Sequence, residues 1–227
     1  MTRTGDELDA ALAARKSVRG FRPDPLPADD LRRLFAIAQR APSWCNIQPW
    51  RVWVTAPPVT GQVSAALLEA ARGGLPAPDV PFPGDYPAPY LSHRRACGFA
   101  LYSAMGIERN DKERRYGAWL RNYELFDAPH LAVVTLDRRL GQYGTLDLGI
   151  WLGFLLAGAA TLGIDACAMA SVAAYPAPLR RIFGIPDDLA VLCGVALGRE
   201  DAAVPANACR TTREPVDANV TFVGFDG

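Results

Sequence analysis

The 227-residue sequence lacks most of the residues and motifs on which common catalytic sites are built. It has two histidines and five widely spaced cysteines with no CxxC pair, which argues against a zinc site and a disulfide framework. No GxGxxG follows a strand, and GxxxxGK[ST], GxSxG and HExxH are all missing. If the protein is an enzyme, a bound cofactor would therefore carry the difficult chemistry.

The sequence also has no excess of charge of either sign. Its 24 basic and 24 acidic residues balance, so neither nucleic acid nor an anionic membrane is an expected partner. The N-terminal residues MTRTGDELDAALAARKS contain no apolar run of the kind found in secretion signals. These features predict a cytoplasmic protein that binds no metal.

One long apolar stretch, 148–164, contains no charged residue and lies at the lower limit for a membrane span. Gly149, Gly153 and Ala157 recur at a spacing of four, which gives a face of small residues suited to close helix packing. No basic cluster flanks the stretch, and acidic residues bracket it. A helix at the centre of a soluble protein or dimer is the favoured interpretation, with a membrane helix as the alternative.

Hydrophobic spacing and proline positions predict many helices and few strands. Helices are expected over 5–16, 31–38, 60–72, 92–107, 111–124, 145–163 and 177–183. Strands are expected over 51–55, 130–136, 189–197 and 220–223. Residues 76–89 contain six prolines in 14 positions and should be irregular, and such long loops are often functional. With no linker and no repeat, residues 1–227 are predicted to form a single α+β domain.

The first candidate site is the heptapeptide from Arg15 to Phe21. Three cations and one hydroxyl fall within five residues there, at the expected end of a helix. If the helical turn persists, Arg15 and Arg19 share one face at a spacing of four. Arginine forks and the Ser17 hydroxyl suit a phosphate or the polar edge of a heterocycle. The alternative is a solvated basic face.

The second candidate site is the segment 41–50, between a helix and a strand. Two prolines restrict its backbone, while Ser43, Asn46 and Gln48 supply hydrogen-bond donors and acceptors. Such a rigid polar loop suits in-plane recognition of a ring that carries carbonyl and NH groups, and a simple turn is the alternative. Cys45 has no base near it in the sequence and is expected to be small buried filler.

Taken together, these two segments resemble the N-terminal pattern of the nitroreductase family, an RxSxR element followed by a PSxxNxQPW loop. The resemblance continues through 158–166, 194–198, Asn207 and 210–213. Residues 169–172 are most similar to the branch that contains nitrobenzoate-type reductases. The similarity spans about residues 12 to 225 and is weak over 73–125.

The resemblance implies an α+β fold in which helices flank a central, mostly antiparallel sheet. It also implies an intertwined homodimer with an exchanged C-terminal arm and FMN at the subunit interface. The implied activity is NAD(P)H-dependent reduction of small nitroaromatic or quinone-like electron-poor acceptors, by a ping-pong two-electron mechanism. NADPH or NADH would be the reductant. No separate catalytic residue is implied, because the flavin carries the chemistry.

The residues that the resemblance implies for FMN binding come from four segments. They are Arg15, Lys16, Ser17 and Arg19; Pro42, Ser43 and Asn46 from the partner subunit; Met169, Ala170 and Ser171; and Arg210 and Arg213. Many relatives have glycine or glutamate where this chain has Ala170-Ser171, which puts a side-chain role there in doubt. Substrate contacts are suggested for Trp119, Tyr123 and Phe126, with core or interface packing as the alternative.

Two other functions stay open at this point. One is a flavoenzyme of the same fold with a different reaction, such as flavin fragmentation, reductive dehalogenation or dehydrogenation. The other is an FMN-binding protein without turnover. Reduction of the flavin by NAD(P)H, followed by reoxidation with a nitroaromatic, separates both from the leading interpretation.

Overall fold

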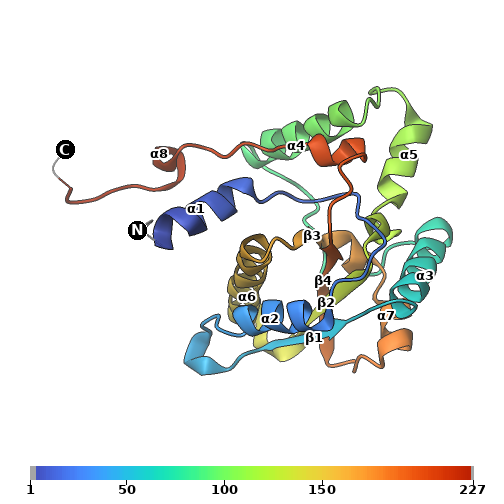
Figure 1. The fold of residues 1–227 in the computed structure, drawn as a ribbon, viewed down its shortest axis with the longest axis horizontal. Helices are drawn as coiled ribbons and strands as arrows, with labels where there is room; N and C mark the ends of the chain where they lie inside the picture. Colours follow the sequence, from blue (N-terminus) through green and yellow to red (C-terminus); the bar gives the residue numbers. More distant parts are fainter. Residues whose placement is uncertain (1–3, 226–227) are drawn as a thin grey trace.

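The computed structural model describes residues 4–225, and Figure 1 shows a central sheet with helices on both sides. The α-helices are α1 Thr4–Ala14, α2 Ala28–Ala38, α3 Val59–Gly73, α4 Tyr90–Ala104, α5 Lys112–Leu120, α6 Gly141–Thr161, α7 Pro176–Phe183 and α8 Val216–Asn219. The strands are β1 Trp50–Val54, β2 His130–Asp137, β3 Asp165–Met169 and β4 Leu189–Gly198. Short 3-10 helices cover Trp44–Asn46, Leu125–Asp127, Arg138–Leu140, Ala170–Ala174 and Pro205–Ala208.

The sheet has the order β1-β2-β4-β3, and every neighbouring pair is antiparallel. Its central strand β2 is buried from His130 to Leu136, as expected for a continuous run of apolar and β-branched residues. The pairing of β2 with β4 shifts register between Val134 and Thr135. The predicted α+β fold with an antiparallel sheet flanked by helices is confirmed.

The sheet is buried on both faces because successive β2 side chains point in opposite directions. Leu131 and Val133 belong to a core cluster with residues of α3 and α7. Ala132 and Val134 belong to a second cluster with residues of α2 and α6. Figure 1 shows α2 and α6 on one side of the sheet and α3 and α7 on the other. The result is a three-layer arrangement.

The third strand was not predicted. The apolar helix expected over 145–163 begins at Gly141 and ends at Thr161, and Gly163 turns the chain with φ of +64°. β3 then pairs with the second half of β4. Its sequence, DACAM, contains no β-branched residue, so local propensity does not indicate a strand. The strand forms because it completes a sheet whose other members lie elsewhere in the chain.

The heptapeptide from Arg15 to Phe21, called the basic segment below, is extended rather than helical. The expectation that Arg15 and Arg19 share one face of a helix is therefore wrong. α1 ends at Ala14, and Ser17 forms an isolated parallel bridge with Ala166. The Val18 amide donates to the Ala166 carbonyl at 3.1 Å. In extended backbone, alternate side chains share a face, so Arg15, Ser17 and Arg19 can still lie together.

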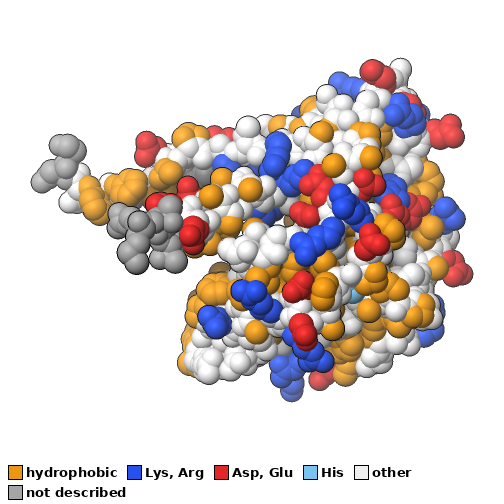
Figure 2. Space-filling view, viewed as in Figure 1, with side chains coloured by type: hydrophobic (Ala, Val, Ile, Leu, Met, Phe, Trp, Pro, Cys, Tyr) orange, Lys and Arg blue, Asp and Glu red, His pale blue; other side chains and the backbone are white. Residues whose placement is uncertain are grey.

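The strand predicted over 220–223 is wrong. After Asn207 the chain leaves the body as an arm, which as far as residue 225 holds only the one-turn helix α8 and no paired strand. Five large apolar side chains of this arm are exposed: Val216, Val220, Phe222, Val223 and Phe225. Figure 2 shows hydrophobic side chains over the projecting arm. Exposed apolar side chains gathered on a short segment are characteristic of interaction surfaces.

α6 buries only one of its faces in this chain. Leu148, Trp151 and Leu155 point into the core, whereas Gly149 and Gly153 are exposed. The stretch Arg138–Thr161 is long and apolar enough to cross a membrane. In its apolar 18-residue part, 39% is buried within this chain. A buried core helix of a soluble protein meets the same criteria. The predicted cytoplasmic location stays a prediction.

The proline-rich stretch 76–89 is irregular, as predicted, and one carboxylate anchors its start. Asp79 accepts hydrogen bonds from Arg138 (2.6 Å), Arg180 (2.7 Å) and the Val191 amide (2.8 Å). Burial alone would raise the pKa of Asp79, but the Val191 amide and the two guanidinium groups hold it below its ordinary value. The helix expected over 111–124 ends earlier, at Leu120.

Both histidines contact other parts of the chain, and neither lines the cavity described below. In His130, Nε2 accepts from the Leu26 amide at 2.8 Å, which leaves Nδ1 to donate to the Thr55 carbonyl at 2.9 Å. His93 is part-exposed and lies 3.0 Å from Glu214 of the arm.

Replacing His130 with leucine should destabilise the fold. The change would leave two buried backbone groups, on Leu26 and Thr55, without partners, at about 1–3 kcal/mol each. The expected loss of unfolding free energy is thus about 2–6 kcal/mol, measured by urea denaturation. The exposed His93→Leu variant serves as the control and should lose less than about 1 kcal/mol. Equal losses in both variants would contradict a bridging role for His130.

Candidate cofactor site

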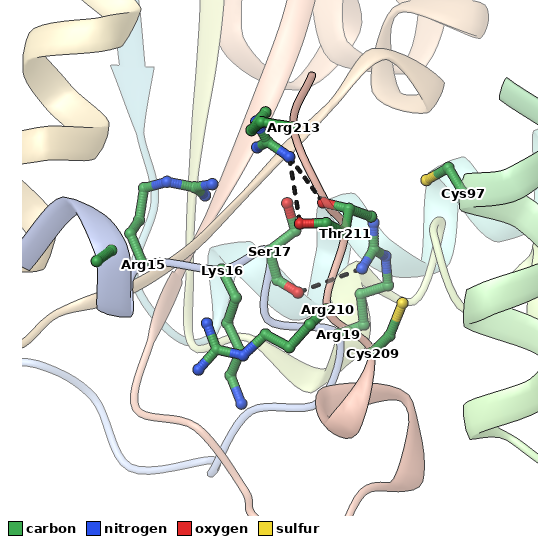
Figure 3. A pocket seen from close by; sticks show the side chains of 10 residues that line it. Arg15, Lys16, Ser17, Arg19, Cys97, Cys209, Arg210, Thr211 and Arg213 are labelled. Carbon is green, nitrogen blue, oxygen red and sulfur yellow. Dashed lines mark hydrogen bonds between the residues drawn. The ribbon is translucent and has the colours of Figure 1, made fainter. Parts of the chain in front are cut away.

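A cavity of about 410 Å³ lies where the basic segment meets the start of the C-terminal arm. Ligand pockets commonly measure about 300–1,000 Å³, so the volume suits a small molecule or part of one. Figure 3 shows the two segments meeting around this cavity, with a third wall from α4. The lining residues are Ala13, Arg15, Lys16, Ser17, Arg19, Cys97, Cys209, Arg210, Thr211 and Arg213. The structure therefore brings together six of the predicted site residues.

The lining is strongly basic, because it contains five cations and no carboxylate. Lys16 is neutralised by Glu200, with Nζ and Oε1 2.6 Å apart, and it also donates to the Asn207 carbonyl. The side chains of Arg19, Arg210 and Arg213 donate only to backbone carbonyls or to Thr211, and none of the four arginines forms an ion pair within residues 4–225. Unpaired guanidinium groups around a concave surface favour an anion such as a phosphate.

Asn207 holds the basic segment against the arm. Its Oδ1 accepts from the Arg19 amide at 2.6 Å, and its Nδ2 donates to the carbonyls of Gly20 and Asp201, each at 2.8 Å. The side chain is almost fully buried. Because a buried amide with three partners is costly to disturb, Asn207 sets the backbone position of Arg19 relative to Arg210 and Arg213.

Replacing Asn207 with alanine should weaken both the fold and anion binding. Losing three hydrogen bonds should cost about 2–4 kcal/mol of unfolding free energy, and Arg19 should lose its fixed position. Thr60→Val is the matched control, because Thr60 is a buried donor to the Pro129 carbonyl and does not line the cavity. Titration with FMN should show weaker binding for Asn207→Ala alone. Equal affinity in both variants would reduce Asn207 to a stability role.

Strand β3 connects the cavity to a second predicted segment. Its start lies beside the basic segment through the Ser17–Ala166 bridge, and its end leads into Ala170 and Ser171. Five residues of strand span about 16 Å. Met169 is buried, whereas Ala170 is exposed and Ser171 is half-buried, with its hydroxyl 3.4 Å from Asn122 Oδ1. Only backbone and small groups thus face outward at this end.

The loop from Pro42 to Gln48 does not line the cavity of its own chain. The Trp44 amide donates to the buried Asp147 carboxylate of α6, and the Gln48 amide donates to Ser43 Oγ at 3.0 Å. Three non-glycine residues, Cys45, Asn46 and Gln48, have positive φ values of 47°, 56° and 48°. Strained backbone held by side-chain contacts is typical of binding loops. Cys45 is exposed, so its interpretation as buried filler is wrong.

Comparison with known proteins tests the resemblance directly. The Nitroreductase family profile matches residues 12–199, which is most of the chain. The chain belongs to the nitroreductase family. It is 33% identical over 230 residues to the 4-nitrobenzoate reductase of Nocardioides sp. (strain LMS-CY), covering 97% of this chain and 92% of that protein.

Two crystal structures of nitroreductases share the fold closely. One is the FMN and NADPH-dependent nitroreductase NfnB from Sphigopyxis sp. strain HMH, at TM-score 0.92 and 32% identity, covering 96% of this chain and 99% of that one. The other is the FMN-dependent nitroreductase NfnB from Mycobacterium smegmatis in complex with NADPH, at TM-score 0.94 and 26% identity. It covers 97% of this chain and 100% of that one. The nitroreductase fold is therefore confirmed.

The three aromatic residues suggested for substrate contact have different environments in this nitroreductase-family chain. Trp119 is partly exposed and stacks on Tyr116, with ring centroids 5.6 Å apart. Tyr123 and Phe126 lie in the core, which favours the packing alternative for both. Burial, followed by the neighbouring Tyr175, raises the pKa of Tyr123 to about 12. A substrate role for Trp119 stays a prediction.

Sequence reasoning missed four residues that line the cavity: Ala13, Cys97, Cys209 and Thr211. Thr211 and Cys209 adjoin the predicted Arg210 and could have been included from their position in the arm. Cys97 lies on α4, in the region where the resemblance is weakest, and no local pattern marks it. Only packing of α4 beside the arm brings it to the cavity.

Proposed function

We propose that this protein is an FMN-dependent NAD(P)H oxidoreductase that reduces nitroaromatic or similar electron-poor small molecules. The observation that carries the proposal is the cavity in which Arg15, Ser17 and Arg19 meet Arg213 of the arm. Relatives named as 4-nitrobenzoate reductase and as FMN and NADPH-dependent nitroreductase, similar over nearly the whole chain, support it.

The residues present fit a flavin phosphate. A phosphate monoester carries about −1.5 to −2 charge at neutral pH, and four unpaired arginines offset it from two sides. The Ser17 hydroxyl adds a neutral donor. Lys16, by contrast, is committed to Glu200, so we assign it to holding the segment in place rather than to the phosphate itself. β3 leads from this cavity toward Met169, Ala170 and Ser171, which would contact the remainder of the cofactor.

We further propose an intertwined homodimer of single-domain subunits, residues 1–227. α6 presents an exposed apolar face with Leu146, Gly149 and Gly153, and the arm carries exposed apolar side chains that a partner would cover. In such a dimer the exposed polar loop with Pro42, Ser43 and Asn46 would reach the flavin of the partner subunit. The arm would be exchanged between subunits.

Bound FMN would supply two-electron redox chemistry between NADPH or NADH and the acceptor. The chain's own contribution is binding and electrostatics. Arg15, Arg19, Arg210 and Arg213 would hold the phosphate, and backbone groups of Ala170 and Ser171 would meet the ring. Trp119 would form part of the acceptor pocket. No side chain is required as a dedicated acid, because water can protonate an exposed product.

Anaerobic titration of the flavin-loaded protein with NADPH tests this function. We expect loss of the oxidised flavin absorbance, followed by its recovery when 4-nitrobenzoate is added. A protein that binds FMN but is not reduced would be a flavin-binding protein without turnover. A flavin that is reduced but not reoxidised by the nitroaromatic would point to another reaction on the same fold. Absence of FMN binding would refute the proposal entirely.

A further inference from the structure

Two free cysteines from distant parts of the chain line the proposed phosphate cavity. Cys97 lies on α4 and is exposed, whereas Cys209 begins the arm and is buried. Figure 3 shows both side chains on the same side of the cavity, facing the arginines. Resting on the proposed function, we propose that Cys97 and Cys209 form a reversible thiol pair. Oxidation of this pair to a disulfide by a hydroperoxide would release FMN.

The other three cysteines do not share these properties. Cys167 and Cys193 lie in β3 and β4 of the sheet. Burial raises the pKa of the Cys193 thiol to about 12, and burial also raises that of Cys167 despite the nearby Arg19 and Arg15. Such thiols are poorly reactive at neutral pH. Cys45 is exposed in its own loop and does not line this cavity. Of the five cysteines, only Cys97 and Cys209 line the same cavity, and Cys97 is exposed.

Helix α4 is able to approach the arm with little loss of packing. None of its residues is fully buried, and the irregular stretch 76–89 precedes it. Its contact with the arm includes the His93–Glu214 pair, at 3.0 Å, one helical turn before Cys97. A disulfide requires Cα atoms about 4.4–6.8 Å apart, so its formation would fix α4 against the arm at that separation. The S–S bond would then cross the wall of the cavity that both cysteines line.

One molecule of hydrogen peroxide oxidises one pair of thiols and is itself reduced to water. The exposed Cys97 sulfur attacks a peroxide oxygen, the O–O bond breaks, and a sulfenic acid and water are formed. The Cys209 sulfur then attacks the sulfenic sulfur and displaces a second water. The sum is two thiols plus hydrogen peroxide giving one disulfide and two waters. A dithiol reductant reverses the step.

Oxidation and FMN binding should oppose each other because both need the same space. If the disulfide lowers FMN affinity by some factor, bound FMN must disfavour the disulfide by the same factor. We expect a change of about tenfold or more, which corresponds to a typical coupling free energy. The pair would then respond to peroxide mainly when the flavin has already been lost.

The test treats full-length protein, FMN-free and FMN-loaded, with hydrogen peroxide and maps disulfides by mass spectrometry after alkylation. We expect a Cys97–Cys209 link in FMN-free protein and little of it in FMN-loaded protein. FMN titrations before and after oxidation should show the lower affinity, with recovery after dithiothreitol. Cys97→Ser and Cys209→Ser should each make FMN affinity insensitive to peroxide, whereas Cys45→Ser should behave as the unmodified protein does.

Two outcomes would overturn the inference. One is oxidation of Cys97 to sulfinic acid, or to links with other cysteines, without a Cys97–Cys209 bond. The other is formation of that bond with no change in FMN affinity. Failure of the proposed function looks different, because reduced protein would then bind no FMN before any peroxide is added.

Discussion

Arg213→Gln should lower FMN affinity about 10- to 100-fold, since a hydrogen bond to a charged group contributes about 1.5–3 kcal/mol. Arg213 comes from the arm and faces a cavity whose other arginines belong mostly to the N-terminal segment. Glutamine keeps polarity and much of the side-chain length while removing the charge. The dissociation constant can be measured by the quenching of flavin fluorescence.

Two controls make the Arg213 result specific to a phosphate. Arg139→Gln removes an exposed arginine that pairs with Asp137 away from the cavity, and FMN affinity should stay unchanged. Riboflavin lacks the phosphate, so its weaker binding should be nearly insensitive to Arg213→Gln. If both flavins lost affinity equally in this variant, the arginine would act on the ring or on the fold, and the phosphate assignment would be wrong.

Gly153→Leu should separate the proposed dimer into monomers. Gly153 lies on the exposed face of α6, and an added Cβ there meets nothing within 4 Å in the chain. The single subunit can therefore accept leucine, whereas a partner packed closely on the glycine cannot. A central interface position contributes about 2 kcal/mol or more, so dimer dissociation should increase at least about 30-fold. Sedimentation equilibrium measures this, and FMN should be lost with the partner's loop.

Leucine substitutions at two other glycines serve as controls for the Gly153 experiment. Gly61 of α3 is also exposed and helical, with nothing within 4 Å of an added Cβ, so Gly61→Leu should leave the dimer intact. Gly158, by contrast, faces Ile37, which an added Cβ would approach to 2.9 Å, and Gly158→Leu should destabilise the subunit itself. A Gly153→Leu protein that remains dimeric and keeps FMN would place the interface elsewhere.

Much of the secondary structure could be predicted because it follows from local patterns. The apolar periodicity of α2, the prolines of 76–89 and the β-branched run of β2 each act within a few residues. The late strand over 220–223 was predicted wrongly for the same reason. Its apolar residues satisfy a local pattern, yet none of the four strands within residues 4–225 pairs with them.

The candidate site was predictable only in part. The sequence by itself determined that Arg15, Ser17 and Arg19 form a basic segment and that Arg210 and Arg213 form another. Their residue types already favour an anion. Tertiary structure decided that the first segment is extended, since Ser17 and Val18 pair with Ala166 of a strand that local propensity does not indicate. Hydrogen bonds between residues far apart in the chain outweighed the helical preference of the N-terminal segment.

Tertiary structure also decided which cations of the basic segment remain available to a ligand. Lys16 is adjacent to Arg15 in sequence, yet Glu200 neutralises it while the arginine stays unpaired. The polar loop around Asn46 is held against α6 and does not line the cavity of its own chain. The residue types alone indicate the chemistry of the site, because charge is a property of single residues. The positions of these residues could not be predicted in that way, because Arg19 is held by Asn207, almost 200 residues distant in the chain.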